Sequence, residues 1–487
     1  MSMGSRTGTV AAIGLFLGAT SLQAPALEAA AGQNRSAEPL CRRAAPLPAL
    51  PAEARQATSR MDSLPSSDSD GYAVEVTGTR VRRSNLESSA PITSADSDEF
   101  ADVDRRASSR RPDRRTEPQP GQLTAGDHDD LLNPELYAQY VRAMLGKQAV
   151  DQVPRVDTRR VLTVRVKDES GRPVPFADVT LTCADGNSLT LATVADGSAT
   201  FFPELDRLGR SVSLTTGGMA QSEARTVTFA GPSGAQEQTL TVSRRAAPVS
   251  RLDLMVVLDT TGSMQDEIDY LKAELREILA DVARSHPGLD IRLGLVAYRD
   301  EGDAYVTRTF AFTGDLDSMQ NHLREQMAGG GGDMPEAMDQ ALARALAAEW
   351  RPDAVRAILL VADAPPHPEN VAKTWMIAEA ARARRIQIVP VAASGVDDLA
   401  QYVMRAMAAA TQSRYLFLTD DSGIGNAHAE PSVDCYRVTR LDALVRRVLD
   451  GFVSGRRVEA RDDEIIRTVG TYDQGRCVLP RNFRPVD

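Results

Sequence analysis

The chain has little of several features that would define a function at once. It contains four cysteines in 487 residues, 5% of its residues are aromatic, and it has no run of 18 apolar residues. Four scattered cysteines are too few for a disulfide scaffold, and the missing apolar run argues against a membrane-spanning helix in the mature chain. The formal net charge of -11 excludes general affinity for nucleic acid, because phosphates attract a basic surface.

Familiar catalytic motifs are also missing. The sequence has no His-Glu-x-x-His run and no Gly-x-Ser-x-Gly elbow, and none of its five histidines is paired by spacing with a nucleophile. The glycine run 329–332 lacks the Lys and the Ser or Thr of a phosphate loop, so we interpret it as a flexible connector. We therefore predict that the protein is not an enzyme, with metal-assisted hydrolysis as a minor alternative.

The most informative stretch is an apolar run that ends in a loop with one carboxylate and two hydroxyls. Asp259, Thr261 and Ser263 alternate within Leu-Met-Val-Val-Leu-Asp-Thr-Thr-Gly-Ser-Met, residues 254–264. An uninterrupted apolar strand is typical of the buried centre of a parallel sheet, and doubly wound sheets bind ligands at the carboxyl ends of such strands. Short oxygen ligands at that point suit a hard divalent cation.

The pattern Asp-x-Thr-x-Ser resembles the metal-ion-dependent adhesion site of von Willebrand factor type A domains. Residues 250–456 agree with this resemblance, because helical and strand periods alternate through them. Helices are predicted at 266–285, from 315, and at 335–348, 369–384, 399–411 and 441–453, and strands at 291–298, 305–312, 357–363, 386–391 and 415–418. The predicted fold class is α/β, a doubly wound and mainly parallel sheet with helices on both faces.

The resemblance implies that two more loops contribute to the site. Asp363 matches the Asp that the family places at the end of a later strand, whereas Asp333 stands about where the family has a Thr. If the strand order is the family's, Asp259 and Asp363 end neighbouring strands at the reversal point of the sheet, and both carboxylates face one crevice. Asp333 is the one departure from the pattern, and it changes the charge of the site.

A divalent cation held by Asp259, Thr261, Ser263, Asp333 and Asp363 is therefore the predicted cofactor. Mg²⁺ is the expected ion because it keeps several waters and needs few protein ligands, while Ca²⁺ and Mn²⁺ tolerate the additional carboxylate. The resemblance implies that an open coordination position accepts a carboxylate from a partner protein. Three carboxylates around a divalent ion leave a net negative charge, so this attraction should be weaker than at a site with Thr.

Nearby residues have competing interpretations. His367 follows Asp363 by four residues, and it either approaches the rim of the site or is a bonded loop histidine, the more common case. Asp300, Glu301 and Asp303 either hold a second cation or form a solvated hairpin turn. Some domains of the family have lost the metal and act as scaffolds, which keeps a metal-independent interpretation open.

Residues 1–31 are predicted to be an export signal. Arg6 precedes the apolar stretch 10–19, and small residues follow it. We expect the mature chain to begin between about residues 25 and 35. The protein would then be in the periplasm, the outer envelope or the extracellular space.

Residues 32–157 are rich in Ser, Pro, Asp and Arg and poor in aromatics, which predicts a linker with at most one short helix at 131–145. Within it, the segment 74–95, which begins Val-Glu-Val-Thr-Gly-Thr-Arg-Val-Arg-Arg, resembles the start of the plug in TonB-dependent outer-membrane receptors. No barrel sequence follows. The resemblance implies a Gram-negative envelope and an outer-membrane or TonB-linked partner, and a simple exposed strand is the alternative.

Residues 158–246 change to a period of two with Gly turns, which predicts a small β-sandwich. The stretch 166–179 resembles carboxypeptidase-regulatory and transthyretin-like modules of exported proteins. Cys183 is interpreted as a core residue of a strand. Cys435 and Cys477 are predicted to form a bridge that ties the tail, residues 457–487, to the end of the α/β domain.

Together these patterns predict an exported cell-envelope protein that binds a partner protein through a divalent cation. A metal-independent scaffold in an envelope assembly is the main alternative, and it would keep its partner in the presence of a chelator. A metal-dependent hydrolase is a weaker alternative, and it would show turnover.

Overall fold

The computed structural model describes most of the chain after residue 120 and one short segment before it. The described residues are 39–50, 121–147, 154–217, 219, 223–231, 233–332, 334–393, 395–423, 428, 431–479 and 481–484. The predicted export signal at 1–31, the receptor-like segment at 74–95 and Asp333 lie outside these residues, and what was inferred for them stays a prediction.

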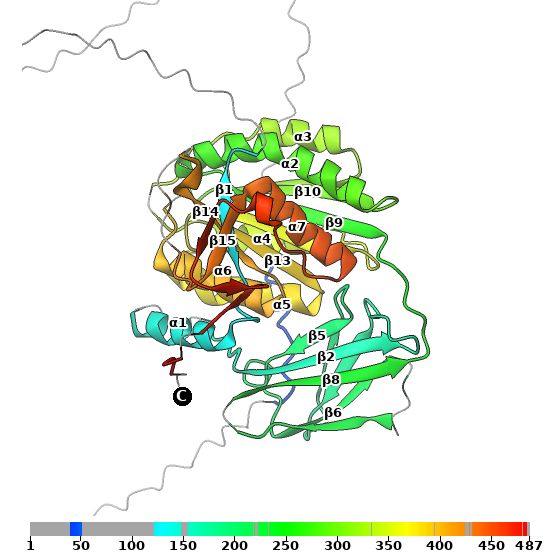
Figure 1. Cartoon of the computed structure of the whole chain (residues 1–487). Helices are drawn as coiled ribbons and strands as arrows, with labels where there is room; N and C mark the ends of the chain where they lie inside the picture. The colour runs from blue at the N-terminus through cyan, green and yellow to red at the C-terminus, as the bar shows by residue number, and fades with distance from the viewer. Residues whose placement is uncertain are drawn as a thin grey trace, which may run out of the picture. The chain divides into compact units, whose positions relative to one another are not determined.

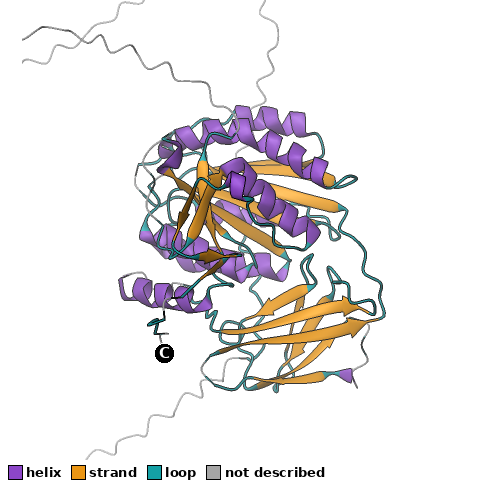
Figure 2. Cartoon of the chain, viewed as in Figure 1, coloured by secondary structure: helices purple, strands orange, loops and turns teal. Residues whose placement is uncertain are grey.

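Among the described residues, nine strands form one sheet in the order β11-β10-β9-β12-β13-β14-β1-β15-β16 (Figures 1 and 2). The five strands from β10 to β14 in this order run parallel to one another. The bounds are β1 Thr124–His128, β9 Arg251–Asp259, β10 Asp290–Tyr298, β11 Thr307–Thr313, β12 Val355–Ala362, β13 Ile386–Ala392, β14 Tyr415–Thr419, β15 Tyr436–Arg440 and β16 Arg467–Val469. The predicted mainly parallel α/β fold is confirmed.

Helices cover both faces of this sheet (Figure 1). Apolar residues of α2, α3 and α7 belong to one core, and those of α4, α5 and α6 belong to another. The bounds are α1 Pro134–Lys147, α2 Gln265–Ser285, α3 Leu316–Arg324, α4 Met338–Ala347, α5 Val371–Ala383, α6 Asp398–Ala410 and α7 Leu441–Ser454, with 3-10 turns η2 Gly262–Met264, η3 Pro368–Asn370, η4 Asp420–Ser422 and η5 Asp462–Glu464. Within the described part, no helix is long and apolar enough to cross a membrane.

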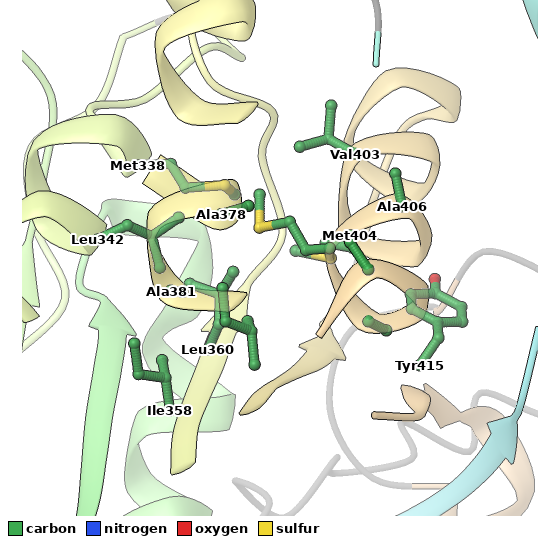
Figure 3. Packing of buried hydrophobic residues seen from close by; sticks show 14 of the residues in the cluster. Met338, Leu342, Ile358, Leu360, Ala378, Ala381, Val403, Met404, Ala406 and Tyr415 are labelled. Carbon is green, nitrogen blue, oxygen red and sulfur yellow. The ribbon is translucent and has the colours of Figure 1, made fainter. Parts of the chain in front are cut away.

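The two cores explain the apolar run in β9. Met255 and Val257 face the core below α4, α5 and α6, whereas Leu254, Val256 and Leu258 face the core below α2, α3 and α7. Because both faces of the strand are covered, it has no polar alternation. Figure 3 shows side chains of the first core packed between α4, α5, α6 and the sheet. Full burial of such a side chain contributes about 1.5–3 kcal/mol, so this packing fixes the strand that carries the site.

A strand that the sequence analysis did not predict lies inside the sheet. β1 pairs antiparallel with β14, with Thr124 opposite Thr419, and its amino end also pairs with β15. Its sequence, Thr-Ala-Gly-Asp-His, has no apolar alternation, which is why it fell within the predicted linker. Gly126 is required where the strand passes an aromatic ring, since a Cβ there would lie 2.6 Å from Phe417. The α/β domain therefore includes residues on both sides of the inserted β domain.

Buried ion pairs hold β1 and α1 in place. The guanidinium of Arg405 donates two hydrogen bonds to the carboxylate of Asp130, from Nε to Oδ2 at 3.1 Å and from Nη2 to Oδ1 at 2.6 Å. Arg414 Nη1 lies 3.1 Å from Asp127 Oδ2. The predicted short helix at 131–145 corresponds to α1. These contacts replace the apolar pattern that usually marks a buried strand.

Residues 160–242 form two further sheets around a separate core. One sheet has the order β5-β2-β8 and the other β4-β3-β6-β7. The bounds are β2 Arg160–Asp168, β3 Asp178–Thr182, β4 Ser188–Ala192, β5 Ser198–Phe201, β6 Ser211–Thr216, β7 Arg225–Thr228 and β8 Gly234–Val242. Gly171, Gly186 and Gly197 adopt positive φ at the turns, a conformation that glycine accepts without strain. The likeness of this domain to modules of exported proteins stays a prediction.

All four cysteines form disulfides, Cys41 with Cys183 and Cys435 with Cys477. The predicted bridge between Cys435 and Cys477 is confirmed. Cys183 is a core residue, as predicted, and lies directly after β3, but its disulfide with Cys41 was not predicted. Its partner lies 142 residues earlier, and neither spacing nor period connects the two.

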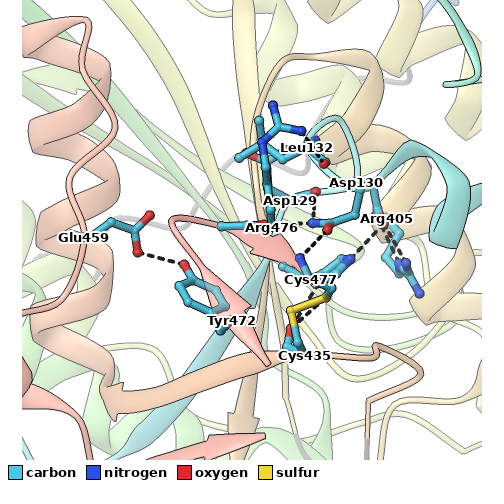
Figure 4. The surroundings of a disulfide bond; sticks show 12 residues. Asp129, Asp130, Leu132, Arg405, Cys435, Glu459, Tyr472, Arg476 and Cys477 are labelled. Carbon is cyan, nitrogen blue, oxygen red and sulfur yellow. Dashed lines mark hydrogen bonds and ion pairs between the residues drawn. A yellow bond between two sulfur atoms is a disulfide. The ribbon is translucent and has the colours of Figure 1, made fainter. Parts of the chain in front are cut away.

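The Cys435–Cys477 bridge lies where the tail meets the start of α1 (Figure 4). Two short strands, β17 Tyr472–Asp473 and β18 Arg476–Cys477, form a hairpin there. The Cys477 amide donates a hydrogen bond to Asn133 Oδ1 at 2.7 Å, and Asn133 Nδ2 donates one to the carbonyl of Gly475 at 2.8 Å. The bridge and these bonds fasten the tail to a segment far earlier in the chain.

Replacing both Cys435 and Cys477 with Ser is expected to lower the free energy of unfolding by about 3 to 4 kcal/mol, because opening a 42-residue loop raises the entropy of the unfolded chain. Urea unfolding under non-reducing conditions measures the difference. A loss below about 1 kcal/mol would mean that the hydrogen bonds around Asn133 hold the tail without help from the bridge.

Candidate metal centre

Two carboxylates lie side by side where β9 and β12 end. The strands are parallel neighbours with Leu258 opposite Val361, so Asp259 lies one residue and Asp363 two residues beyond the last pair. The chain continues from β9 to β10 on one side and from β12 to β13 on the other, which makes this the reversal point of the sheet. The prediction that these two strands are neighbours in the sheet is confirmed.

Asp259 shapes the loop that follows it. Its Oδ1 accepts hydrogen bonds from the amide nitrogen and the hydroxyl of Thr261, at 2.9 and 2.7 Å. An Asp side chain often bonds its own backbone two residues on, and here the bond turns the chain into η2. The side chain is fully buried next to the buried hydroxyl of Tyr298 on β10, which acts on the carboxylate as a hydrogen-bond donor. One oxygen is thus used by the loop, and the charge of the carboxylate has no cationic partner among the described residues.

Ser263 and Asp363 meet at the same place. Ser263 lies in η2 with an exposed side chain, and its hydroxyl donates a hydrogen bond to the carboxylate of Asp363. Asp363 is 5% exposed, and its Oδ1 is buried without a partner in the described part of the chain. The structure therefore brings together four of the five predicted ligands. The fifth, Asp333, is not among the described residues.

The glycine run packs closely against the loop after β9. Gly329 donates a hydrogen bond to the carbonyl of Thr260 at 3.1 Å, and Gly262 donates one to the carbonyl of Gly330 at 3.2 Å. Gly330 has φ +79°, and a Cβ there would lie within 2.4 Å of the Asp303 carboxylate. The interpretation as a flexible connector is wrong, because the loop is bonded to its neighbours and needs glycine for close approach.

A third carboxyl that the sequence analysis missed reaches this place. Glu336 is 3% exposed, and its Oε2 lacks a hydrogen-bond partner among the described residues. A Cβ on Gly331 would lie 3.1 Å from Glu336 Oε1 and 3.3 Å from Thr261 Cβ, so the carboxyl is next to the loop that follows β9. The residue was hidden in the helix predicted from 335, but α4 begins only at Met338.

Burial raises the pKa of all three carboxyls, and acidic neighbours add to the effect. Burial, followed by Asp363, raises the pKa of Asp259 to about 7. Burial is also the main cause for Asp363, whose pKa rises to about 6. Burial and then Asp259 raise the pKa of Glu336 to about 9. A divalent cation would oppose both causes, because it favours the charged form of each carboxyl.

The acidic turn after β10 has partners of its own. His367 Nε2 lies 2.6 Å from Asp300 Oδ1, which fits the bonded loop histidine. Asp303 Oδ2 accepts a hydrogen bond from the amide of Gly331 at 2.9 Å, and Glu301 Oε1 accepts one from Gln340 Nε2 at 2.8 Å. These bonds favour the hairpin-turn interpretation over a second cation.

The residues present fit a Mg²⁺ site of few protein ligands. Within the described ranges, no three His, Cys, Asp or Glu side chains converge to form a metal site by themselves. Mg²⁺ does not need such a cluster, because it keeps several waters and is bound through one or two carboxylates. The buried carboxylates of Asp259 and Asp363 and the hydroxyls of Thr261 and Ser263 are the groups that would hold it.

Residues 253–428 match the family model of the von Willebrand factor A domain. This part of the chain is therefore a von Willebrand factor A domain, as the sequence resemblance implied. The match includes the loops that carry Asp259 and Asp363.

Curated relatives are similar to part of the chain. The chain is 32% identical over 118 residues to the alpha-protein kinase vwkA of Dictyostelium discoideum, which is 24% of this chain and 19% of that protein. It is 41% identical over 93 residues to von Willebrand factor A domain-containing protein 7 of Homo sapiens, which is 19% of this chain and 10% of that protein. The chain thus spans less than a fifth of either relative.

Among solved structures, BatB from Bacteroides thetaiotaomicron aligns with a TM-score of 0.29 and 12% identity, over 42% of this chain and 98% of that one. The pilus adhesin SpaC from Lactobacillus rhamnosus GG aligns with a TM-score of 0.28 and 13% identity, over 34% of this chain and 28% of that one. The fold assignment rests on the strand order and the family match instead.

Proposed function

We propose that the von Willebrand factor A domain binds a divalent cation through Asp259, Thr261, Ser263 and Asp363, with Asp333 as a further predicted ligand. Mg²⁺ is the expected ion, and Ca²⁺ and Mn²⁺ are alternatives. The observation that carries the proposal is the pair of buried carboxylates at the sheet reversal point, for which the described residues supply hydroxyl donors but no cationic partner. Buried charges in proteins are normally paired or bound to metal.

We further propose that the bound cation accepts a carboxylate from a partner protein. Ser263 and the neighbouring Gly330 are exposed, so a partner can approach the site at this edge. A cation with an open coordination position there suits a carboxylate from an approaching protein. Binding, rather than catalysis, is the proposed role of the domain.

Export of the protein is proposed from its cysteines. Both disulfides join residues that are distant in sequence, and such bridges form and persist in oxidising compartments. The proposed location is the periplasm, the outer envelope or the extracellular space. An outer-membrane or TonB-linked partner is proposed from the sequence of 74–95 alone.

Titration of the purified, chelator-treated chain with Mg²⁺, Mn²⁺ and Ca²⁺ by calorimetry tests the metal site. A pulldown from envelope extract, with and without chelator, then tests the partner. No metal binding at millimolar concentration would contradict the proposal. A partner retained equally in chelator would instead favour the metal-independent scaffold, and metal-dependent turnover of an ester or phosphoester would favour the hydrolase.

Replacing Ser263 with Ala is expected to weaken metal binding by about tenfold or less, because the site loses a neutral ligand worth roughly 1 kcal/mol rather than a charge. Calorimetric titration with Mg²⁺ measures the change. Ser285→Ala, at an exposed position at the far end of α2, is the matched control and should bind like the wild type. A loss as large as that of an Asp259 variant would contradict the neutral role of Ser263.

A further inference from the structure

The backbone of Glu336 is fixed to the loop that carries Asp363. The amide of Glu336 donates a hydrogen bond to the carbonyl of Pro365 at 2.9 Å, and Glu336 forms an isolated parallel bridge with Pro366. Its own carbonyl accepts a bond from the amide of Met338 at 2.8 Å, where α4 begins. The position of the side chain is therefore set by the same loop that places one of the proposed metal ligands.

The carboxyl of Glu336 points to the metal loop. Its Oε1 shares the space beside Gly331 with Thr261, and only a residue without a side chain at 331 leaves that space open. The charged groups that act most strongly on it are Asp259, Asp300, Asp303 and Asp363, all of them acidic. Burial and repulsion raise its pKa to about 9.

Two other buried carboxylates of this domain are paired with arginines, whereas Glu274 is buried with a raised pKa beside backbone amides of residues 121–123. Asp130 receives two hydrogen bonds from Arg405, and Asp253 receives bonds from both Arg292 and Arg351. A buried carboxylate is costly unless it is paired in this way. Glu336 is also buried, but it faces acidic residues instead. What distinguishes Glu336 is its place beside Thr261, where a bound cation would compensate its charge.

We propose that Glu336 is a positioning residue of the metal centre, which acts on the cation at Asp259 and Asp363 through a metal-bound water. The inference rests on the proposed function. We assign it this outer role because its carboxyl lies beside Thr261, whereas Asp259 and Asp363 stand at the ends of the two neighbouring strands. Mg²⁺ keeps its waters, and a buried carboxylate just beyond them can accept their hydrogen bonds and orient them.

This role gives Glu336 two opposite effects. Its negative charge strengthens cation binding. Residues that hydrogen-bond to metal ligands commonly have this effect. The same charge opposes an incoming carboxylate, so Glu336 makes the loaded site selective for partners that approach with additional positive or neutral groups. The sequence suggested Asp333 as the source of the third negative charge at the site. Glu336, which is buried, supplies such a charge.

The test compares Glu336→Gln with the wild type in the full chain, with Mg²⁺ and Mn²⁺ as the probes. Calorimetry should show metal affinity reduced about 10- to 100-fold, the range typical when an outer partner of a metal site is removed. The melting temperature in chelator should be unchanged or higher, because a buried and repelled acid is gone. Glu301→Gln, an exposed acid of the adjacent turn, is the control and should bind metal like the wild type.

Glu336→Asp keeps the charge on a shorter side chain, and it should bind metal more tightly than Glu336→Gln. If the wild type binds metal and Glu336→Gln binds it equally well, the inference is overturned while the proposed function stands. It is likewise overturned if Glu336→Gln melts lower in chelator and keeps the full rise with metal, which would show a purely structural role. An Asp variant no better than the Gln variant would exclude charge as the cause. If the wild type binds no metal, both proposals fail.

Discussion

Replacing Asp259 with Asn is expected to abolish the stabilisation that Mg²⁺ or Mn²⁺ gives to the wild-type protein. The substitution removes the charge of a central ligand, but the amide oxygen can still accept the two hydrogen bonds from Thr261. Ala would remove this acceptor from a fully buried position and would disturb the loop as well. A metal at 100 times its dissociation constant stabilises by about 2.7 kcal/mol, and the variant should show almost none of this.

Thermal unfolding in chelator and in saturating metal gives the melting temperature of the metal-free and the metal-bound form of each protein. Asp317→Asn removes a negative charge from an exposed position of α3 and should keep the full response to metal. The Asp259→Asn variant should unfold in chelator at the wild-type temperature or above, since one of several repelling carboxylates is gone. If this variant still responds to metal like the wild type, the cation lies elsewhere.

The metal-free protein is expected to lose stability as pH rises from about 4 to 7. Burial, and then Asp363, raise the pKa of Asp259 from 3.8 to about 7 in the folded state. Below the unfolded value the acid is protonated in both states and its contribution is complete. Between the two values the unfolded chain releases the proton more readily, so folding becomes less favourable. A shift of this size corresponds to about 4 kcal/mol.

Saturating Mg²⁺ should remove this loss, because the cation binds the ionised carboxylates. Urea unfolding at pH 5 and pH 8, with chelator and with metal, gives the four free energies that are needed. Burial also raises the pKa of Glu274 to about 8, so other acids titrate in the same range. The Asp259→Asn variant in chelator provides the reference that isolates Asp259. An identical fall with pH in the wild type and in this variant would count against the buried acid pair.

The sequence predicted those parts of the fold whose cause is local. The apolar run before Asp259 marks a strand covered on both faces, and helical spacing marked each helix of the α/β domain within a few residues. Asp259 and Asp363 were found because each directly ends such a strand. Their adjacency followed from the strand order that the family resemblance implied.

The features that the sequence did not reveal depend on contacts between distant segments. β1 is held by pairing with β14 and by the ion pair of Asp127 with Arg414, so its residues need no strand period. The sequence predicted Glu336 in the first turn of a helix. Only its backbone bridge to Pro366 and the position of its carboxyl beside Gly331 place it at the site. Cys41 and Cys183 are joined across 142 residues, a distance at which spacing carries no information.

The position of β1 has a consequence for the order of events during synthesis. Thr124 pairs with Thr419, 295 residues later, so β1 leaves the ribosome long before its partners exist. At about 5 to 20 residues per second, β1 waits roughly 15 to 60 s for β14 to be made. The β domain of residues 160–242 has all its strands within that interval and can fold while synthesis continues. The sheet that carries the metal centre closes only when the last part of the chain returns to one of the first, which makes its folding an event of the nearly complete protein.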